Sequence, residues 1–244
     1  MKEKLKAFTI HLSISFCVGL LFSIIIFFIW YPSPLAKATG VTTIFLILLF
    51  IDVIIGPLLT FIVYQKNKKT LKFDLICIAV IQVAALIYGF NTVYQGKPAW
   101  LVFNADRADV VRINELDLRK ITKAKNEYKK PSLFSPQWVV AKQPDDIKEK
   151  NDITFEAVFA GIDIAQRPEL YSPISESKLE INSKALNLNQ LSKYNDRDIT
   201  KNVLEKYPNA DAYLPLKANA VDMTVLVNRK TGEVVKIVDL RPWN

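Results

Sequence analysis

The apolar residues of this chain are concentrated in its first part. Within the first 96 of 244 residues, three long apolar blocks cover residues 8–30, 41–64 and 74–94. Each block has about 20 residues or more, and at ~1.5 Å per residue an α-helix of that length crosses a ~30 Å hydrocarbon core. We therefore expect a membrane protein with three N-terminal transmembrane α-helices in a membrane domain, residues 1–96, followed by one α+β domain, residues 97–244.

Lysines around these blocks predict the orientation. Three lysines precede the first block and four lie between the second and third, whereas one lies between the first and second. These are Lys2, Lys4 and Lys6, then Lys66, Lys68, Lys69 and Lys72, and finally Lys37. Because cytoplasmic loops carry the excess of Lys and Arg, the N-terminus is expected in the cytoplasm. Three crossings then place residues 97–244 in the periplasm, if the membrane is a bacterial inner (cytoplasmic) membrane.

A cleaved signal peptide is the alternative reading of the first block. The basic start, the apolar run and Ala36-Lys37-Ala38 resemble a signal sequence with its cleavage site. The run of about 20 residues is longer than the usual ~7–15, and Pro32 and Pro34 follow it. We expect an uncleaved helix; cleavage would leave two spans and the same location for the C-terminal domain.

Composition excludes several kinds of site in residues 97–244. This part carries 24 basic and 21 acidic residues, so most of the net charge of +8 lies beside the membrane blocks and no nucleic acid partner is expected. Cys17, Cys77 and His11 all lie in the first 96 residues. The C-terminal domain therefore lacks the residues for a disulfide, a Cys or His metal site or a Ser–His–Asp triad. We expect no enzyme, no cofactor and no metal.

A hydrolase with paired carboxylates remains open, because acids such as Asp106, Asp109, Asp163 and Glu169 are plentiful. Nothing in their spacing distinguishes them from solvated surface acids. Asp106-Arg107 lies in a predicted tight turn and is interpreted as a structural ion pair.

Short alternating apolar segments predict the elements of the C-terminal domain. Strands are expected at 100–103, 109–113 and 138–141, and a hairpin at 223–227 and 233–238 with Gly232 at the positive-φ position. Helices are expected within 114–128 and at 153–159, 185–194 and 199–207. These elements together make one α+β domain of about 148 residues, enough for a core.

Small residues on the first apolar block are one candidate partner-binding site. Ser15, Gly19 and Ser23 recur at four-residue spacing, which puts them on one helix face that another helix can approach closely. The face either packs against the second or third helix of this chain or forms a groove for a partner helix.

Asp52 is a second candidate, midway along the second block and four residues before Gly56-Pro57. A carboxylate in a membrane is costly, ~3 kcal/mol on insertion scales, so it needs a partner. Gln82 lies at similar depth in the third block, whereas His11 lies nearer the cytoplasmic edge. Pro57 removes a helix hydrogen bond and is expected to leave polar backbone nearby. A structural role, partner recognition and proton or ion transport are the three interpretations, and three helices with one acid offer no evident transport pathway.

Two rigid, proline-containing segments of the C-terminal domain, 167–171 and 213–216, are candidate recognition surfaces or core caps. Tyr213 is the candidate partner-binding residue among them.

The order of motifs resembles that of type IV pilin accessory proteins of the TfpX/TfpZ kind, over nearly the whole chain. The matching residues are Trp30-Tyr31-Pro32, 52–60, Asp74-Leu75, Gln82, Tyr88-Gly89, 103–107, Gly161-Ile162-Asp163, Arg167-Pro168, Tyr171, 213–216, 231–235 and 240–243. The resemblance implies a bacterial inner-membrane protein that assists type IV pilin, as a pilin-specific chaperone or assembly factor. Its expected partner, pilin, has a transmembrane stem and a periplasmic head. The alternatives are a carboxylate-based envelope enzyme and a membrane-anchored periplasmic sensor or scaffold.

Overall fold

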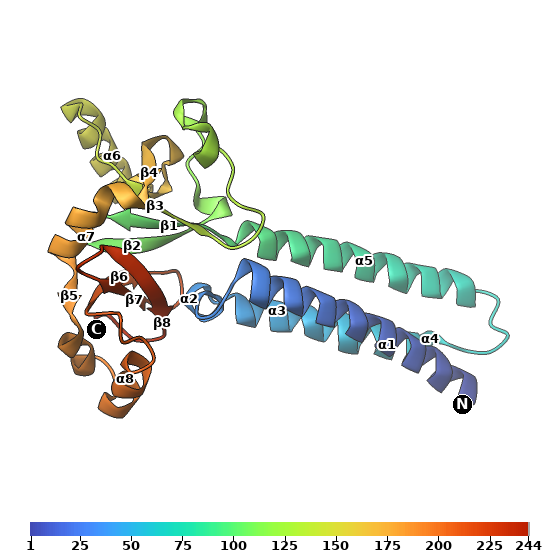
Figure 1. The fold of residues 1–244 in the computed structure, drawn as a ribbon. Helices are drawn as coiled ribbons and strands as arrows, with labels where there is room; N and C mark the ends of the chain where they lie inside the picture. The colour runs from blue at the N-terminus through green and yellow to red at the C-terminus, as the bar shows by residue number, and fades with distance from the viewer. Residues whose placement is uncertain (244) are drawn as a thin grey trace. The chain divides into compact units, whose positions relative to one another are not determined.

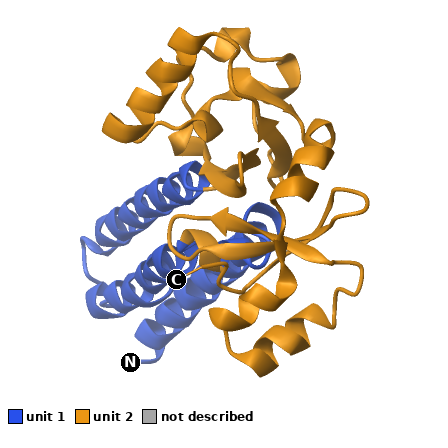
Figure 2. Ribbon diagram, turned by 90° about the vertical axis from the view of Figure 1, so that its left-hand side faces the viewer, with its two compact units in different colours: residues 1–36, 40–96 blue, residues 37–39, 97–244 orange. Residues whose placement is uncertain are grey.

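The computed structural model describes residues 1–243, which form two compact units. The first comprises Met1–Ala36 and Gly40–Gly96, and the second comprises Lys37–Thr39 with the chain from Lys97 onward (Figure 2). The predicted architecture is confirmed: three N-terminal helices able to span a membrane are followed by a mixed-sheet domain with helices.

The three helices of the first unit run over Lys2–Trp30, Val41–Val63 and Leu71–Gln95 (Figure 1). The first consists of α1 (Lys2–Ile24) and a π-helix, η1 (Ile25–Trp30). The second consists of α3 (Val41–Phe50), a π-helix, η2 (Ile51–Ile55), and α4 (Gly56–Val63), and the third is α5 (Leu71–Gln95). A short helix, α2 (Leu35–Thr39), precedes α3.

Aromatic side chains join the first and third helices at one end of this unit. The Trp30 ring lies 4.9 Å from the Phe90 ring and 5.2 Å from the Tyr94 ring, centroid to centroid. The Tyr31 hydroxyl donates a hydrogen bond to the carbonyl of Val93 at 2.6 Å. Trp and Tyr are the side chains that favour a membrane–water interface.

The second unit is built on an eight-stranded sheet in the order β4-β3-β1-β2-β6-β7-β8, with β5 paired to β6. The strands are β1 (Pro98–Asn104), β2 (Arg107–Arg112), β3 (Gln137–Ala141), β4 (Tyr171–Pro173), β5 (Leu186–Asn187), β6 (Ala212–Lys217), β7 (Met223–Asn228) and β8 (Glu233–Val238). The β1–β3 and β2–β6 pairs are parallel and the others antiparallel. The predicted β1–β2 pair, the strand β3 and the β7–β8 hairpin are confirmed.

Helices α6 (Ile147–Phe159), α7 (Lys178–Lys184) and α8 (Arg197–Leu204) accompany the sheet. Short 3-10 turns connect them at Ile113–Glu115, Ile121–Lys123, Asn126–Tyr128, Ile164–Gln166, Pro168–Leu170, Ile174–Ser177 and Leu188–Lys193. Trp100 belongs to one core cluster, with its ring 5.8 Å from that of Tyr128 and 5.6 Å from that of Tyr171.

Two predicted helices are wrong. Residues 114–128 contain only 3-10 turns, and residues 185–194 form β5 followed by a 3-10 helix. In the second case pairing overrides local propensity, because Leu186 pairs with Tyr213 of β6. Conversely, α6 begins six residues before the predicted start, since the Asp146 carboxylate accepts a hydrogen bond from the Lys148 N–H and caps it.

Candidate functional site

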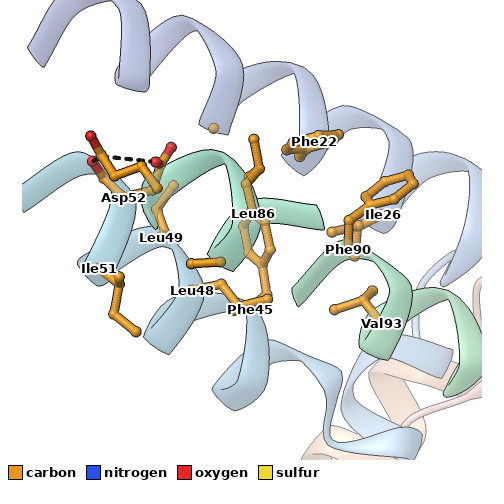
Figure 3. Close-up of a pocket in the computed structure, with 13 residues that line it drawn as sticks. Phe22, Ile26, Phe45, Leu48, Leu49, Ile51, Asp52, Leu86, Phe90 and Val93 are labelled. Atoms are coloured by element: carbon orange, nitrogen blue, oxygen red, sulfur yellow. Dashed lines mark hydrogen bonds between the residues drawn. The ribbon is translucent and has the colours of Figure 1, made fainter. Parts of the chain in front are cut away.

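A polar pair lies at the middle of the membrane unit. The Gln82 side-chain amide donates hydrogen bonds to the Asp52 carboxylate and to the Asp52 backbone carbonyl, each at 3.1 Å (Figure 3). Gln82 thus supplies the partner that a carboxylate in hydrocarbon requires, and it joins the second helix to the third.

The π-helix explains why the Asp52 carbonyl is open to Gln82. In an α-helix this carbonyl would accept from the N–H of Gly56, four residues on. Here the Gly56 N–H donates to the Ile51 carbonyl instead, and Pro57 has no N–H to offer. Gly56 also makes room for the amide, because a Cβ atom at this position would lie 1.9 Å from the Gln82 nitrogen.

Two cavities meet at this pair. The smaller, about 50 Å³, is apolar and enclosed by side chains such as Phe22, Phe45 and Phe90 from all three helices (Figure 3). The larger, about 510 Å³, is lined by the first, second and third helices and is here called the membrane groove. Its lining consists of Ala7, Ile10, His11, Ile14, Ser15, Val18, Asp52, Thr60, Leu75, Ala79, Gln82, Val83 and Leu86.

The membrane groove presents polar atoms within an apolar wall. His11 Nδ1 and Thr60 Oγ1 share a hydrogen bond of 2.6 Å. The Gln82 Oε1 atom is buried and accepts no hydrogen bond from any of residues 1–243. An unsatisfied acceptor in a low-dielectric site is costly, so this atom favours an incoming group that carries a donor.

The structure separates the three small residues of the first helix. Gly19 packs against the second helix of this chain, where a Cβ atom would lie 2.6 Å from Leu49 Cδ1. Ser15 is buried and lines the membrane groove, and the Ser23 hydroxyl donates to the Gly19 carbonyl at 2.8 Å. The contact at Gly19 is therefore intramolecular, and partner binding at these residues stays a prediction.

Tyr213 lies in the core of the C-terminal domain. Its side chain is 0% exposed, and its hydroxyl donates to the Pro242 carbonyl at 3.4 Å. Arg167 and Tyr171 of the other proline-containing segment are also buried. A role of Tyr213 in partner binding stays a prediction.

Asp109 and Asp163 come together beside a polar cavity of about 210 Å³. The Asn104 amide donates to Asp109 at 3.1 Å and to Asp163 at 3.4 Å. Arg107 pairs with Asp109 at 3.0 Å and with Asp163 at 3.6 Å, so the predicted Asp106–Arg107 pair is replaced by these two. Burial raises the pKa of Asp109, while the neighbouring Arg107 opposes the shift.

The Asp163 carboxylate also accepts the Ile164 N–H and caps the following 3-10 turn. Both Asp109 and Asp163 therefore take part in contacts that stabilise the local fold. Among the described residues 1–243, no three His, Cys, Asp or Glu side chains gather in a way that could hold a metal ion.

A second charged network holds α6 in place. The buried Arg167 contacts Asp117 at 3.3 Å and also pairs with Glu156, and Arg119 pairs with both acids. Hydrogen bonds from Arg119 and then Arg167 lower the pKa of Glu156 to about 2. Lys120 adds a pair with Glu149 of the same helix.

Away from these ion pairs, α6 carries exposed apolar side chains. Ile147, Phe155, Val158 and Phe159 are each at least 66% exposed, and the Phe155 and Phe159 rings stack at 5.1 Å. These four residues are here called the α6 apolar face. Clustered apolar exposure of this kind marks interaction surfaces, and the spacing of 155, 158 and 159 is the sequence signal that could have revealed it.

Comparison with known proteins identifies relatives of nearly full length. The chain is 30% identical over 239 residues to two proteins of Dichelobacter nodosus, "Fimbrial assembly protein, serogroup I" and "Fimbrial assembly protein, serogroup E1". Each match covers 95% of this chain and 93% of the relative. The model of the family described as fimbrial assembly protein FimB matches residues 1–40. No solved structure matches the chain significantly.

Proposed function

This chain belongs to the fimbrial assembly protein family, and from that membership we propose that it acts as a pilin-specific chaperone or accessory factor in the membrane. A role in pilus assembly follows from the family itself, and the resemblance predicted from sequence is confirmed at that level. The finer proposal is that the protein holds type IV pilin before or during its incorporation into the fibre.

The proposed setting is the bacterial inner membrane, with the N-terminus in the cytoplasm and the C-terminal domain in the periplasm. The lysine distribution supports this orientation, since seven of the eight lysines in the first 96 residues lie before the first apolar block or between the second and third blocks. A protein oriented in this way has its helices in the membrane and its C-terminal domain in the periplasm, as pilin has its stem in the membrane and its head outside it.

The observation that carries the proposal is the membrane groove with its unsatisfied Gln82 acceptor. The walls of the groove are apolar, so they match the apolar transmembrane stem of pilin. The groove volume of about 510 Å³ admits side chains of a helix from another protein. Helices associate in lipid through close packing and interhelical hydrogen bonds. A stem that brings a donor to Gln82 Oε1 would satisfy an atom that no described residue satisfies.

The pilin head is proposed to contact the α6 apolar face. The head continues the stem covalently, so capture of the stem brings the head to the side of the membrane that holds the C-terminal domain. The apolar surface offered to the pilin head consists of Phe155, Val158 and Phe159. The helix that carries them is fixed to the domain by the ion pairs that Arg119 and Arg167 form with Glu156.

This proposal needs no catalysis. The paired acids Asp109 and Asp163 share Arg107 and Asn104, and the names of the relatives describe assembly. We therefore propose a binding role for the C-terminal domain.

Photo-crosslinking in cells tests the proposal. A photoreactive amino acid would replace Ile14 or Val83 in the membrane groove, or Phe159 on the α6 apolar face. Controls with matched exposure are Phe16 and Ile62 on the membrane helices and Leu179 on α7, none of which lines the groove or belongs to the α6 apolar face.

The expected result is a pilin adduct from Ile14, Val83 and Phe159 and little or none from the three controls. Adducts of equal yield from groove and control positions would contradict stem capture in the groove. Adducts from Ile14 and Val83 without one from Phe159 would remove the α6 part alone.

A further inference from the structure

Lys97 connects the end of the third membrane helix to a distant loop. Helix α5 ends at Gln95, and the Lys97 α-carbon lies at most ~7 Å along the chain from that of Gln95. The Lys97 side chain is fully buried, and its ammonium donates a hydrogen bond to the Ser132 carbonyl at 2.6 Å. Its own carbonyl accepts from the Ile113 N–H. The Lys97 side chain therefore links Ser132 to the backbone two residues after the end of α5.

The level of α5 in a bilayer follows from its length and its neighbours. Its 25 residues at ~1.5 Å each span about 38 Å, which exceeds a ~30 Å hydrocarbon core by about 8 Å in all. Trp30 and Tyr94, in ring contact, lie at the same end. Because aromatic side chains of this kind favour the membrane–water interface, we expect the end of α5 at Gln95 to lie at the level of the lipid headgroups.

The loop that Lys97 holds exposes two large apolar side chains next to Ser132. Leu133 is 66% exposed and Phe134 is 67% exposed. Pro131 and Pro136 restrict the backbone on either side, and the Phe134 N–H donates to the Ser132 hydroxyl at 3.1 Å. The loop therefore keeps both side chains exposed on a constrained backbone.

The segment that precedes this loop is basic. Lys123, Lys125 and Lys130 are exposed, and Glu127 is the acid between them. Lysines beside exposed apolar residues match a bilayer that carries anionic headgroups above its acyl chains.

We propose that residues 129–134 form a membrane-surface anchor, in which Leu133 and Phe134 insert into the leaflet where α5 ends and the neighbouring lysines bind anionic headgroups. The anchor fixes the C-terminal domain against the bilayer through a point beside its covalent connection. It requires no pilin, and it stands or falls independently of the proposed function.

Depth-dependent quenching in vesicles tests the anchor. The full chain, with Cys17→Ser and Cys77→Ser to remove its two cysteines, would carry Phe134→Cys or Leu133→Cys labelled with a fluorophore. Leu179→Cys on α7 is the control, because Leu179 is 85% exposed and has no link to the Lys97–Ser132 hydrogen bond. Vesicles contain phosphatidylethanolamine and phosphatidylglycerol, with a spin-labelled lipid as quencher.

The expected quenching at positions 133 and 134 is at least twice that at position 179, and it falls when phosphatidylglycerol is omitted or when Lys130→Gln is added. Two labelled positions keep the test valid if one variant fails to fold, as judged by its thermal unfolding midpoint. Equal quenching at 134 and 179 would overturn the anchor. The anchor would also be overturned if the fluorophore at position 134 changed its quenching only when pilin is reconstituted with the protein. That result would assign the loop to contact with a protein partner.

Discussion

The side-chain nitrogen of Gln82 lies 3.1 Å from both the carboxylate and the backbone carbonyl of Asp52, although 30 residues separate the two. One amide group therefore satisfies two acceptors of the second helix that the hydrocarbon core would otherwise leave without a donor. The oxygen of the same amide is buried and accepts no hydrogen bond from any described residue, and Gln82 is one of the residues that line the membrane groove. Helix packing and the proposed recognition of a partner thus depend on one side chain.

Gln82→Leu is expected to destabilise the membrane unit by about 1–3 kcal/mol, because it leaves the Asp52 carbonyl and carboxylate unpaired. It should also lower the amount of pilin that co-purifies in mild detergent. Thermal unfolding of the solubilised protein measures the first effect. Ile81→Leu, at a residue 67% exposed on the same helix, is the control and should behave as the parent. Equal stability of both variants would contradict the role of the hydrogen bonds.

Gly19→Leu is expected to separate the first helix from the second, since even a Cβ atom would lie 2.6 Å from Leu49. Overpacking of this kind typically costs about 1–3 kcal/mol, so the protein should unfold at a lower temperature and capture less pilin. Ser13→Leu adds the same side chain at an exposed position of the same helix and should have little effect. If Gly19→Leu left unfolding unchanged but abolished capture, Gly19 would contact pilin directly instead.

Glu156→Gln is expected to change the acid stability of the C-terminal domain. Pairing with Arg119 and Arg167 lowers the pKa of Glu156 to about 2, so its contribution to stability is complete above the ordinary glutamate pKa of ~4.3 and is lost as the pH falls toward 2. The variant should unfold more easily than the parent at pH 6, and the difference should shrink between pH 4 and pH 2. Tryptophan fluorescence during thermal unfolding measures it. Glu180→Gln on α7 is the control, and a difference that stayed constant with pH would refute the linkage.

Asp163→Asn separates a binding role from catalysis by paired carboxylates. Asparagine can also cap the turn that begins at Ile164, so the fold should be retained. We expect unchanged numbers of surface pili in cells that carry the variant, counted by electron microscopy. A carboxylate enzyme that used Asp109 with Asp163 would lose its activity, and a loss of pili with normal protein levels would favour that alternative.

The membrane architecture could be predicted because its signals are local. An uninterrupted apolar block of about 20 residues is long enough to cross a bilayer as a helix, and this can be read from the block alone. Tyr31 or Tyr94 at a block end likewise indicates the membrane–water interface without reference to any other segment. The hairpin at Gly232 was predictable for a similar reason, since its φ of +66° favours glycine.

The helix expected at 185–194 illustrates the opposite case. Its residues favour a helix locally, yet Leu186 pairs with Tyr213 of β6. Only the sheet in the folded structure shows that β6 lies beside this segment. The exposed face of α6 depends likewise on Glu156 meeting Arg167 and Arg119.

The sequence alone thus determined that three helices able to span a membrane precede an α+β domain and that Asp52 needs a partner in the membrane. The tertiary structure decided that Gln82 is the partner, that Gly19 packs inside the protein and that Tyr213 lies in its core. Composition and periodicity report on stretches of neighbouring residues, whereas these three outcomes depend on how helices rotate and strands pair across distances that no local pattern records.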